Sequence, residues 1–221
     1  MNIEQARFNM IEQQIRPWDV LNQGVLELLA VVKREDFVPA QYRALAFVDS
    51  EVPLPTSTGP GQCMLAPKVE ARLLQELAVH KHERVLEIGA GSGYMAALLA
   101  HKAQYVSTLE IDPELARFAR ANLRRAGVMN ATVINADGAD GLPGDAPFDV
   151  IVLSGSVAEV PDVLLSQLKV GGRLTAIVGQ QPVMRAVLIT RSGDQGLERT
   201  VLFDAVAQRL QGFPEPPRFR F

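Results

Sequence analysis

Three glycines at alternate positions form the most chemically informative motif of the sequence. The apolar stretch 84–88 is followed by Gly89, Gly91 and Gly93, so an expected strand leads into a turn that opens a helix. Gly89 and Gly91 let the backbone turn tightly and let a ligand approach without interference from a Cβ atom. Gly93 is expected to let the helix pack close to the strand. Turns of this kind lie at the carboxyl ends of parallel strands, where open sheets bind ligands.

The spacing of these glycines indicates which ligand the turn suits. Dinucleotide sites carry G-x-G-x-x-G and seat a pyrophosphate on the helix N-terminus, whereas this sequence has G-x-G-x-G followed by Tyr94. Glu87, two residues before Gly89, is poorly suited to a pyrophosphate and well suited to a cationic group such as an amino-acid ammonium. The pattern therefore disfavours a nicotinamide dehydrogenase. A glycine-rich turn without a ligand is the alternative interpretation.

Two further acids stand at the ends of the next two expected strands. Glu110 follows Gly93 by 17 residues, where an acid can accept hydrogen bonds from ribose hydroxyls; alone it could be a solvated strand end. Asp137 could accept from the exocyclic amine of a nucleobase, with Gly138 leaving room for the ring; alone it could be a turn acid. Acids at three successive strand ends describe a ligand with an ammonium, a ribose and an adenine. The predicted cofactor-binding residues are Glu87, Gly89, Gly91, Gly93, Glu110, Ile111, Asp137 and Gly138.

The elements that must position these residues begin near residue 83. From there on, short apolar strands alternate with helices, which predicts a parallel sheet covered on both faces. Only residues 191–197 separate the last two strands, which fits a hairpin. The predicted fold is therefore α/β, with a seven-stranded, mostly parallel, doubly wound sheet that ends in an antiparallel hairpin. The expected strands are Arg84–Ile88, Tyr105–Ile111, Thr132–Ala136, Phe148–Leu153, Arg173–Val178, Val183–Thr190 and Glu198–Phe203, and the expected helices are Ser92–His101, Pro113–Ala126 and Pro161–Leu168.

Residues 1–82 are expected to form an N-terminal helical arm with a loop that borders the site. Asn2 is the predicted cap of a helix that runs through Ile15, and Asp19 is the predicted cap of a second helix. The stretch 39–61, rich in proline and glycine, is interpreted as extended loop. Pro67 is expected to begin a helix that runs to about residue 80.

Two further segments complete the predicted organisation. Residues 83–212 form the expected cofactor-binding core, and residues 213–221 form a proline-rich tail. Chain ends are commonly loosely ordered, and this is the first interpretation of the tail. The alternative is that Phe219 and Phe221 dock on the sheet or on a partner.

The composition excludes several classes of protein. Among 221 residues, 22 Lys and Arg against 25 Asp and Glu give a net charge of −3, which argues against a nucleic-acid binder. Cys63 is the only cysteine, so an internal disulfide and a cysteine-rich metal site are excluded, and no metal is predicted. The first residues lack the apolar region of a secretory signal, and no apolar stretch approaches the ~18 residues of a membrane span. A soluble cytoplasmic protein without a membrane partner is expected.

The glycine turn and the three acids together resemble the pattern of S-adenosylmethionine methyltransferases. The resemblance narrows to the protein-L-isoaspartate O-methyltransferase family through several further segments. Those segments are Arg34 to Pro39, Tyr42, Pro53-Leu54-Pro55, the run 59–62, Asp137-Gly138, Val160-Pro161, the run from Leu168 to Leu174, and Val178-Gly179. The similarity covers roughly residues 5 to 205. It implies a Rossmann-like methyltransferase fold with S-adenosylmethionine as the cofactor.

The sequence departs from this family at the loop that borders the substrate. The family carries Thr-Ile-Ser-x-Pro after a Gly-x-Gly-Gln segment, and its hydroxyls are implied to handle the substrate carboxyl region. Here Gln62 and Pro67 match, but Cys63, Met64 and Leu65 lie between them, with Leu65 at the serine position, so no catalytic residue is assigned. The predicted substrate lip comprises Gln62, Cys63, Met64, Leu65 and Ser154. Candidate replacement donors are backbone N–H groups and the hydroxyls of Thr56, Ser57, Thr58, Ser154 and Ser156.

The resemblance implies methylation of isoaspartyl carboxyls in damaged proteins or peptides. A carboxyl that titrates near ~4 is already ionised at neutral pH and needs no general base, so catalysis is largely positioning. One alternative keeps the cofactor and changes the acceptor to a small molecule or another protein site. Another is a non-catalytic S-adenosylmethionine-binding module that acts through partners. The sequence does not fix the oligomeric state.

Overall fold

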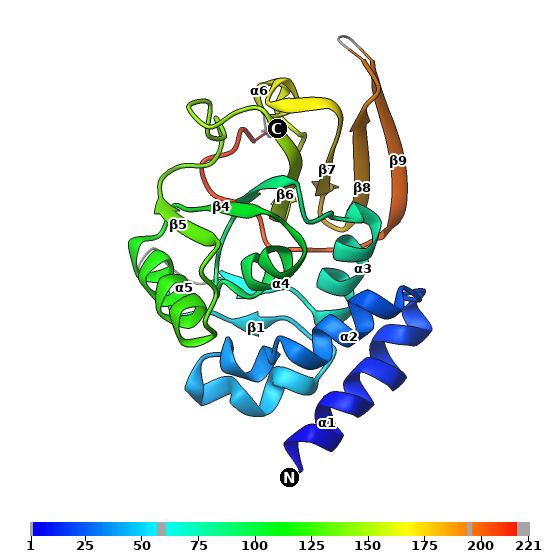
Figure 1. The fold of residues 1–221 in the computed structure, drawn as a ribbon, viewed down its shortest axis with the longest axis vertical. Helices are drawn as coiled ribbons and strands as arrows, with labels where there is room; N and C mark the ends of the chain where they lie inside the picture. The colour runs from blue at the N-terminus through cyan, green and yellow to red at the C-terminus, as the bar shows by residue number, and fades with distance from the viewer. Residues whose placement is uncertain (1, 57–60, 194–195, 216–221) are drawn as a thin grey trace, which may run out of the picture.

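A computed structural model describes residues 2–56, 61–193 and 196–215 of the chain (Figure 1). Its centre is a seven-stranded sheet with the order β5-β4-β3-β6-β7-β8-β9. Neighbouring strands from β5 to β7 are parallel, whereas β8 is antiparallel to both β7 and β9. The predicted fold class, with its antiparallel end, is confirmed. The strands are β3 (Arg84–Ile88), β4 (Tyr105–Glu110), β5 (Ala131–Asn135), β6 (Phe148–Val157), β7 (Leu168–Gln180), β8 (Val183–Arg191) and β9 (Leu197–Asp204).

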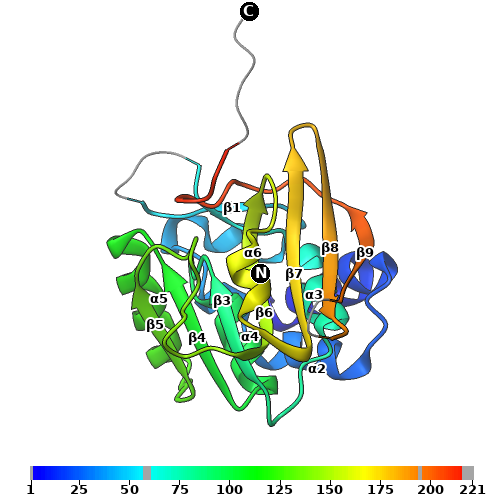
Figure 2. The same cartoon turned by 90° about the horizontal axis from the view of Figure 1, so that it is seen from above.

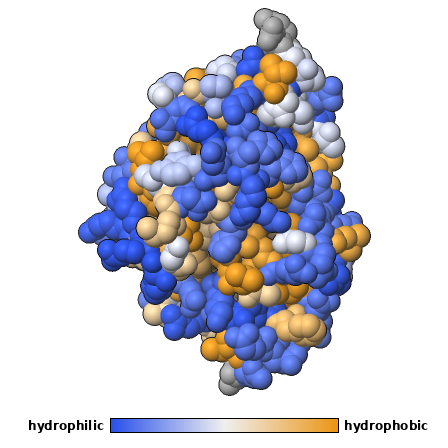
Figure 3. All heavy atoms as spheres, viewed as in Figure 1, coloured by the Kyte–Doolittle hydropathy of each residue, from blue (hydrophilic) through white to orange (hydrophobic). Residues whose placement is uncertain are grey.

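Successive residues of each central strand face two different apolar layers. Val85 of β3 packs in the layer that contains α3 (Pro67–Leu77), α4 (Tyr94–Lys102) and α5 (Pro113–Arg125). Leu86, the next residue, packs in the layer that contains α6 (Asp162–Ser166). The N-terminal helices join the first layer, so residues before and after position 82 share one core. On the outside, the face in Figure 3 is mostly hydrophilic, with hydrophobic residues in small groups.

The chain order places a topological switch point between β3 and β6. From β3 the chain proceeds to β4 on one side, and from β6 it proceeds to β7 on the other side. Ile88 and Leu153 are paired near the carboxyl ends of these two strands. Parallel sheets bind ligands at such points. The segment that follows β9 returns across these strand ends, as the red ribbon in Figure 2 shows.

In the N-terminal arm the first predicted helix is present, and the second helix begins later in the sequence than predicted. α1 (Ile3–Met10) is capped by Asn2, whose side chain accepts from the backbone N–H of Gln5 at 3.2 Å. It continues as a π-helical turn, Ile11–Ile15, and a 3-10 turn, Arg16–Trp18.

The predicted cap at Asp19 is wrong. α2 (Gln23–Val31) begins after Asn22, whose side chain accepts from the backbone N–H of Val25. Asp19 instead ends the preceding turn in a left-handed conformation, with φ of 59°. The amide of Gln75 on α3 donates to the Asp19 carbonyl and accepts from the backbone N–H groups of Leu21 and Asn22. This tertiary contact fixes residues 19–22 as a turn.

The stretch 39–61 contains more regular structure than the extended loop expected of it. The 3-10 helix Ala40–Phe47 follows the shorter 3-10 turn Arg34–Asp36. β1 (Val52–Pro53) then pairs with β2 (Cys63–Met64). Pro39 precedes the 3-10 helix and Pro53 ends β1, where a missing N–H group costs little, so neither proline excluded these elements. Gly59 and Pro60 lie outside the described residues.

Two helices are shorter than predicted because side chains and turns end them. α3 stops at Leu77 rather than near His80: Ala78 adopts φ of 44°, and its carbonyl accepts from the Arg173 guanidinium at 2.8 Å. α6 ends at Ser166, and Leu168, expected as helical, begins β7 instead.

Gly93 was expected to let a helix pack close to a strand. In the structure it lets two helices pack closely against each other. It caps α4 with φ of +82°, and a Cβ atom there would lie 3.2 Å from the Ala119 carbonyl oxygen on α5. The predicted close approach therefore exists, but the partner is α5. α4 consequently begins at Tyr94, two residues later than expected.

We expect Gly93→Ala to lower the free energy of unfolding by about 1–2 kcal/mol, because alanine is strained at this φ and its Cβ crowds α5. Urea titration followed by circular dichroism measures the change. Gly144→Ala is the control, since a Cβ at Gly144 meets nothing within 4 Å. Equal stability of the two variants would contradict the assigned role of Gly93.

Candidate active site

The glycine turn lies against β4 at the switch point. The backbone N–H groups of Gly89 and Ala90 both donate to the Leu109 carbonyl, at 2.9 and 3.1 Å. A cavity of about 40 Å³ lies beside the turn. Of the predicted cofactor-binding residues, its lining includes Gly89, Gly91, Glu110, Ile111 and Gly138. We call it the cofactor-side cavity.

Glu110 organises the turn as well as lining this cavity. One carboxylate oxygen accepts from the Gly91 backbone N–H at 2.8 Å, and the other accepts from the Asp112 backbone N–H at 3.0 Å. Burial raises the pKa of Glu110, and these backbone donors oppose the rise. An ionised carboxylate has about four acceptor positions, so two remain for hydroxyls such as those of a ribose.

Glu87 is fully buried at the boundary between the turn and β6. Its carboxyl oxygens accept from the hydroxyls of Thr108 and Ser154, both at 2.7 Å. Burial raises the pKa of Glu87 to about 7, although both hydroxyls favour the ionised form. A cationic ligand group would favour that form further.

Three of the predicted cofactor-binding residues, Glu87, Gly93 and Asp137, are not in the lining of the cofactor-side cavity. The Asp137 side chain is exposed and accepts from the backbone N–H of Ala139 at 2.9 Å. Gly212 lies directly against it, since a Cβ atom on Gly212 would be 2.4 Å from the carboxylate. Asp137 thus stands at the rim, and its contact with an adenine amine stays a prediction.

The segment after β9 forms a wall of the cofactor-side cavity that the sequence did not reveal. The Ser156 backbone of β6 donates to the Gln208 carbonyl at 2.8 Å and accepts from the Leu210 N–H at 2.9 Å. Leu210 and Gln211 line the cavity. Phe213 is buried against the sheet, so the tail begins as packed structure. Phe219 and Phe221 lie outside the described residues.

A second cavity, of about 20 Å³, adjoins the first on the side of the predicted lip. We call it the acceptor-side cavity. Cys63, Met64, Leu65 and Ser154 line it, and Gln62 lines the cofactor-side cavity. The two cavities share lining residues, namely Leu54, Cys63, Gly89, Gly91 and Ser154.

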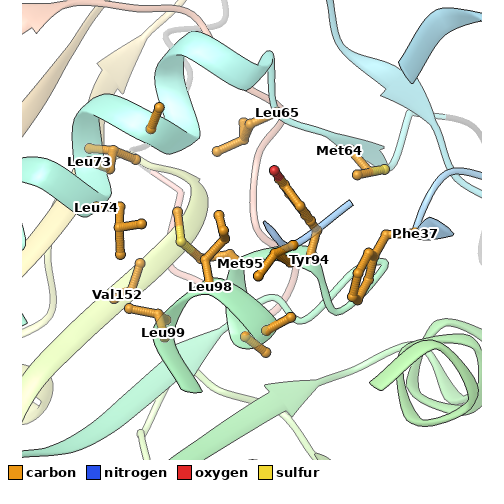
Figure 4. Packing of buried hydrophobic residues seen from close by; sticks show 14 of the residues in the cluster. Phe37, Met64, Leu65, Leu73, Leu74, Tyr94, Met95, Leu98, Leu99 and Val152 are labelled. Atoms are coloured by element: carbon orange, nitrogen blue, oxygen red, sulfur yellow. The ribbon is translucent and has the colours of Figure 1, made fainter. Parts of the chain in front are cut away.

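Glu87, Glu70 and Tyr94 also line the acceptor-side cavity. Glu70 was not among the site residues predicted from the sequence. The signal was available, because Glu70 lies three and four residues before Leu73 and Leu74 on the buried stripe of α3. Tyr94, which had only distinguished the turn from a dinucleotide site, is buried with its ring 5.4 Å from that of Phe37. Figure 4 shows its hydroxyl pointing between Leu65 and Met64.

Of the candidate replacement hydroxyls, two are bonded elsewhere and two lie outside the described residues. The Ser154 hydroxyl donates to Glu87, and the Ser156 hydroxyl donates to the Ala207 carbonyl at 2.9 Å. Ser57 and Thr58 lie outside the described residues. Burial, with Glu51 nearby, raises the pKa of Cys63 to about 12, so its thiol is neutral and a weak donor.

Within residues 2–56, 61–193 and 196–215, no three His, Cys, Asp or Glu side chains are grouped closely enough to hold a metal ion. None of the helices in those ranges combines the length and apolarity needed to cross a bilayer.

Comparison with known proteins identifies the family. The model of the protein-L-isoaspartate(D-aspartate) O-methyltransferase family matches residues 5–206. The chain belongs to this family. A protein-L-isoaspartate O-methyltransferase of Koribacter versatilis is 39% identical over 198 residues, covering 90% of this chain and 87% of the relative. One of Methanoculleus marisnigri is 40% identical, covering 85% of this chain and 84% of the relative.

Solved structures of protein-L-isoaspartate O-methyltransferases have the same fold. One superposes with a TM-score of 0.78 at 24% identity and covers 91% of this chain, which spans 64% of that structure's chain. A putative family member from Plasmodium falciparum, solved in complex with S-adenosyl-L-homocysteine, superposes with a TM-score of 0.76 at 21% identity. That match covers 93% of this chain and 98% of the other.

As a member of the isoaspartate O-methyltransferase family, the chain is a methyltransferase that uses S-adenosylmethionine. The residues present fit that cofactor. Glu110 keeps acceptor positions for ribose hydroxyls, and Glu87 is a buried carboxyl suited to an ammonium. A Cβ atom at Gly138 would lie 2.3 Å from Ile88, so only glycine allows this wall of the cavity to form.

Proposed function

We propose that this protein transfers the methyl group of S-adenosylmethionine to the carboxyl of isoaspartyl residues in proteins and peptides. The observation that supports it most directly is the pair of adjoining cavities that meet at Gly89, Cys63 and Ser154. One is bordered by five of the predicted cofactor-binding residues, and the other by Glu87 and by four of the five predicted lip residues. Such an arrangement brings an acceptor and a methyl donor together across a short shared boundary.

The cofactor supplies a methyl group on a sulfonium: as the bond from methyl to carboxylate oxygen forms, the carbon–sulfur bond breaks and its electron pair stays on sulfur. The protein's own residues bind and orient. We infer that Glu110 holds the ribose and Glu87 the ammonium. Leu54, Met64, Leu65 and Met95 line the acceptor-side cavity and exclude water from it. Since the acceptor carboxylate is already ionised, positioning accounts for much of the rate.

Incubation with methyl-labelled S-adenosylmethionine and an isoaspartyl peptide tests the proposal. We expect base-labile methyl ester on that peptide and none on the same peptide with normal aspartate. Cofactor binding is measured in parallel by calorimetry with S-adenosylhomocysteine. Binding without ester formation would contradict the isoaspartyl acceptor and favour a small molecule or another protein site.

A further inference from the structure

A cluster of buried polar side chains lies beneath the lip. Arg34 of the turn Arg34–Asp36 is 0% exposed, Glu70 of α3 is 5% exposed and Tyr94 of α4 is 1% exposed. They come from three elements that meet behind Met64 and Leu65. Each has an atom without a hydrogen-bond partner: Arg34 Nε, Glu70 Oε2 and Tyr94 Oη. A buried polar atom left unpaired costs about 1–3 kcal/mol, so three in one place call for a functional explanation.

The Arg34 side chain is held by hydrogen bonds within the protein. Its two terminal nitrogens donate to the carbonyls of Ala46, at 3.0 Å, and Leu65, at 2.9 Å. Its Nε lies 3.6 Å from Glu70 Oε2, which is an ion-pair distance but too long for a hydrogen bond. Arg34 does not line the acceptor-side cavity, whereas Glu70 and Tyr94 do. Glu70 and Tyr94 therefore present polar atoms to that cavity: the Tyr94 hydroxyl has no hydrogen-bond partner, and Glu70 Oε2 has only its ion-pair contact with Arg34.

The charges around this cavity determine whether the Glu70 carboxyl is protonated at neutral pH. Glu70 and Glu87 are two buried carboxyl groups that line one small space. Burial raises the pKa of Glu70 to about 8, Arg34 opposes the rise and the charge of Glu87 adds to it. Burial and the charge of Glu70 also raise the pKa of Tyr94. At neutral pH both side chains therefore keep their protons and can donate.

We propose that the Glu70 carboxyl O–H and the Tyr94 hydroxyl donate hydrogen bonds to the acceptor carboxylate and fix its position for methylation. They would supply the donors that the Cys63-Met64-Leu65 lip lacks. This inference rests on the proposed function, because it takes an isoaspartyl carboxylate as the acceptor. It makes Glu70 and Tyr94 acceptor-binding residues of this chain.

The groups that face Glu70 determine the direction of the pH effect. They are Arg34 from the turn Arg34–Asp36, Glu87 from β3, Cys63 from β2 and Tyr94 from α4. Above pH 8, ionised Glu70 loses its O–H donor and places a negative charge beside an incoming carboxylate. A group with a pKa of about 8 goes from about 90% protonated at pH 7 to about 10% at pH 9. Peptide affinity should fall about tenfold across this range.

The test measures isoaspartyl-peptide binding by calorimetry, with the protein saturated with S-adenosylhomocysteine, together with kcat/KM from pH 6 to 9. Glu70→Gln keeps a donor but cannot ionise, so we expect affinity within about threefold of wild type at pH 7 and no alkaline decline. Glu70→Ala and Tyr94→Phe each remove a donor, and we expect affinity about 10- to 100-fold and 3- to 10-fold weaker, respectively. Glu76→Gln on the same helix, where Glu76 pairs with Arg72 at 2.7 Å, should match wild type.

Two results would overturn the inference while leaving the proposed function intact. One is methylation of the peptide with the same pH profile in wild type and Glu70→Gln. The other is wild-type affinity that rises between pH 7 and 9, which would make Glu70 a proton acceptor. Wild-type protein that neither binds nor methylates the isoaspartyl peptide at any pH would refute the proposed function, and this inference with it.

Discussion

Replacing Glu110 with alanine lowers the affinity for S-adenosylhomocysteine by at least about 100-fold. The carboxylate offers two acceptor positions to ribose hydroxyls, and hydrogen bonds to a charged group contribute about 1.5–3 kcal/mol each. A loss of 1.4 kcal/mol corresponds to about tenfold in the dissociation constant. The substitution also frees the backbone N–H groups of Gly91 and Asp112, which Glu110 holds at 2.8 and 3.0 Å, so the glycine turn loses its preferred geometry.

Titration calorimetry at pH 7 measures the effect. The control is Glu114→Ala, which removes an exposed carboxylate at the start of α5 whose partner is Arg117 at 3.6 Å. This variant should bind as wild type does. A dissociation constant of Glu110→Ala within threefold of wild type would remove Glu110 from the cofactor site.

Arg34→Met lowers the free energy of unfolding by about 3–5 kcal/mol. A buried acceptor left without its donor costs about 1–3 kcal/mol, and more where the donor was charged, so two such losses account for a change of this size. Here the carbonyls of Ala46 and Leu65 each lose a guanidinium donor. Methionine fills most of the arginine volume, so the loss reports the hydrogen bonds more than a cavity.

Urea-induced unfolding of the wild type and of Arg34→Met at pH 7 measures the difference in the free energy of unfolding. Arg117→Met is the matched control, since Arg117 is 70% exposed in its side chain and its ion pair with Glu114 is on the surface. We expect that control to change stability by less than about 0.5 kcal/mol. If Arg34→Met also lost less than about 0.5 kcal/mol of unfolding free energy, other contacts would be holding the lip in place.

The sheet was predictable from local patterns, because continuous apolar runs flanked by turn residues specify buried parallel strands. Arg84–Ile88 has the predicted bounds. β6 extends beyond the predicted Leu153 to Val157, because Ser154, Gly155 and Ser156 end the apolar run without ending the strand. The Ser156 backbone is paired by the segment after β9, a partner more than 50 residues away in sequence, and no local pattern predicts such pairing.

The site was predictable to the extent that its residues follow strand ends. Glu87, Glu110 and the glycines lie at the switch point because chain topology places them there. Glu70 and Leu210 depend instead on tertiary packing. A glutamate in an amphipathic helix is ordinarily solvated, and Leu210 lies in a proline- and glycine-containing region with no periodicity. Each acquires its role from neighbours distant in the sequence.

The cofactor-side cavity has one consequence for how the molecule loses activity. Its lining comes from residues spread between Leu54 and Gln211, so only a chain folded across that whole span can retain the cofactor. Binding at 100 times the dissociation constant stabilises a folded protein by about 2.7 kcal/mol, and here that stabilisation acts on the complete structure rather than on one subdomain. A molecule that unfolds locally at either end of this span therefore releases its cofactor and becomes inactive. It does not remain as a partly active enzyme.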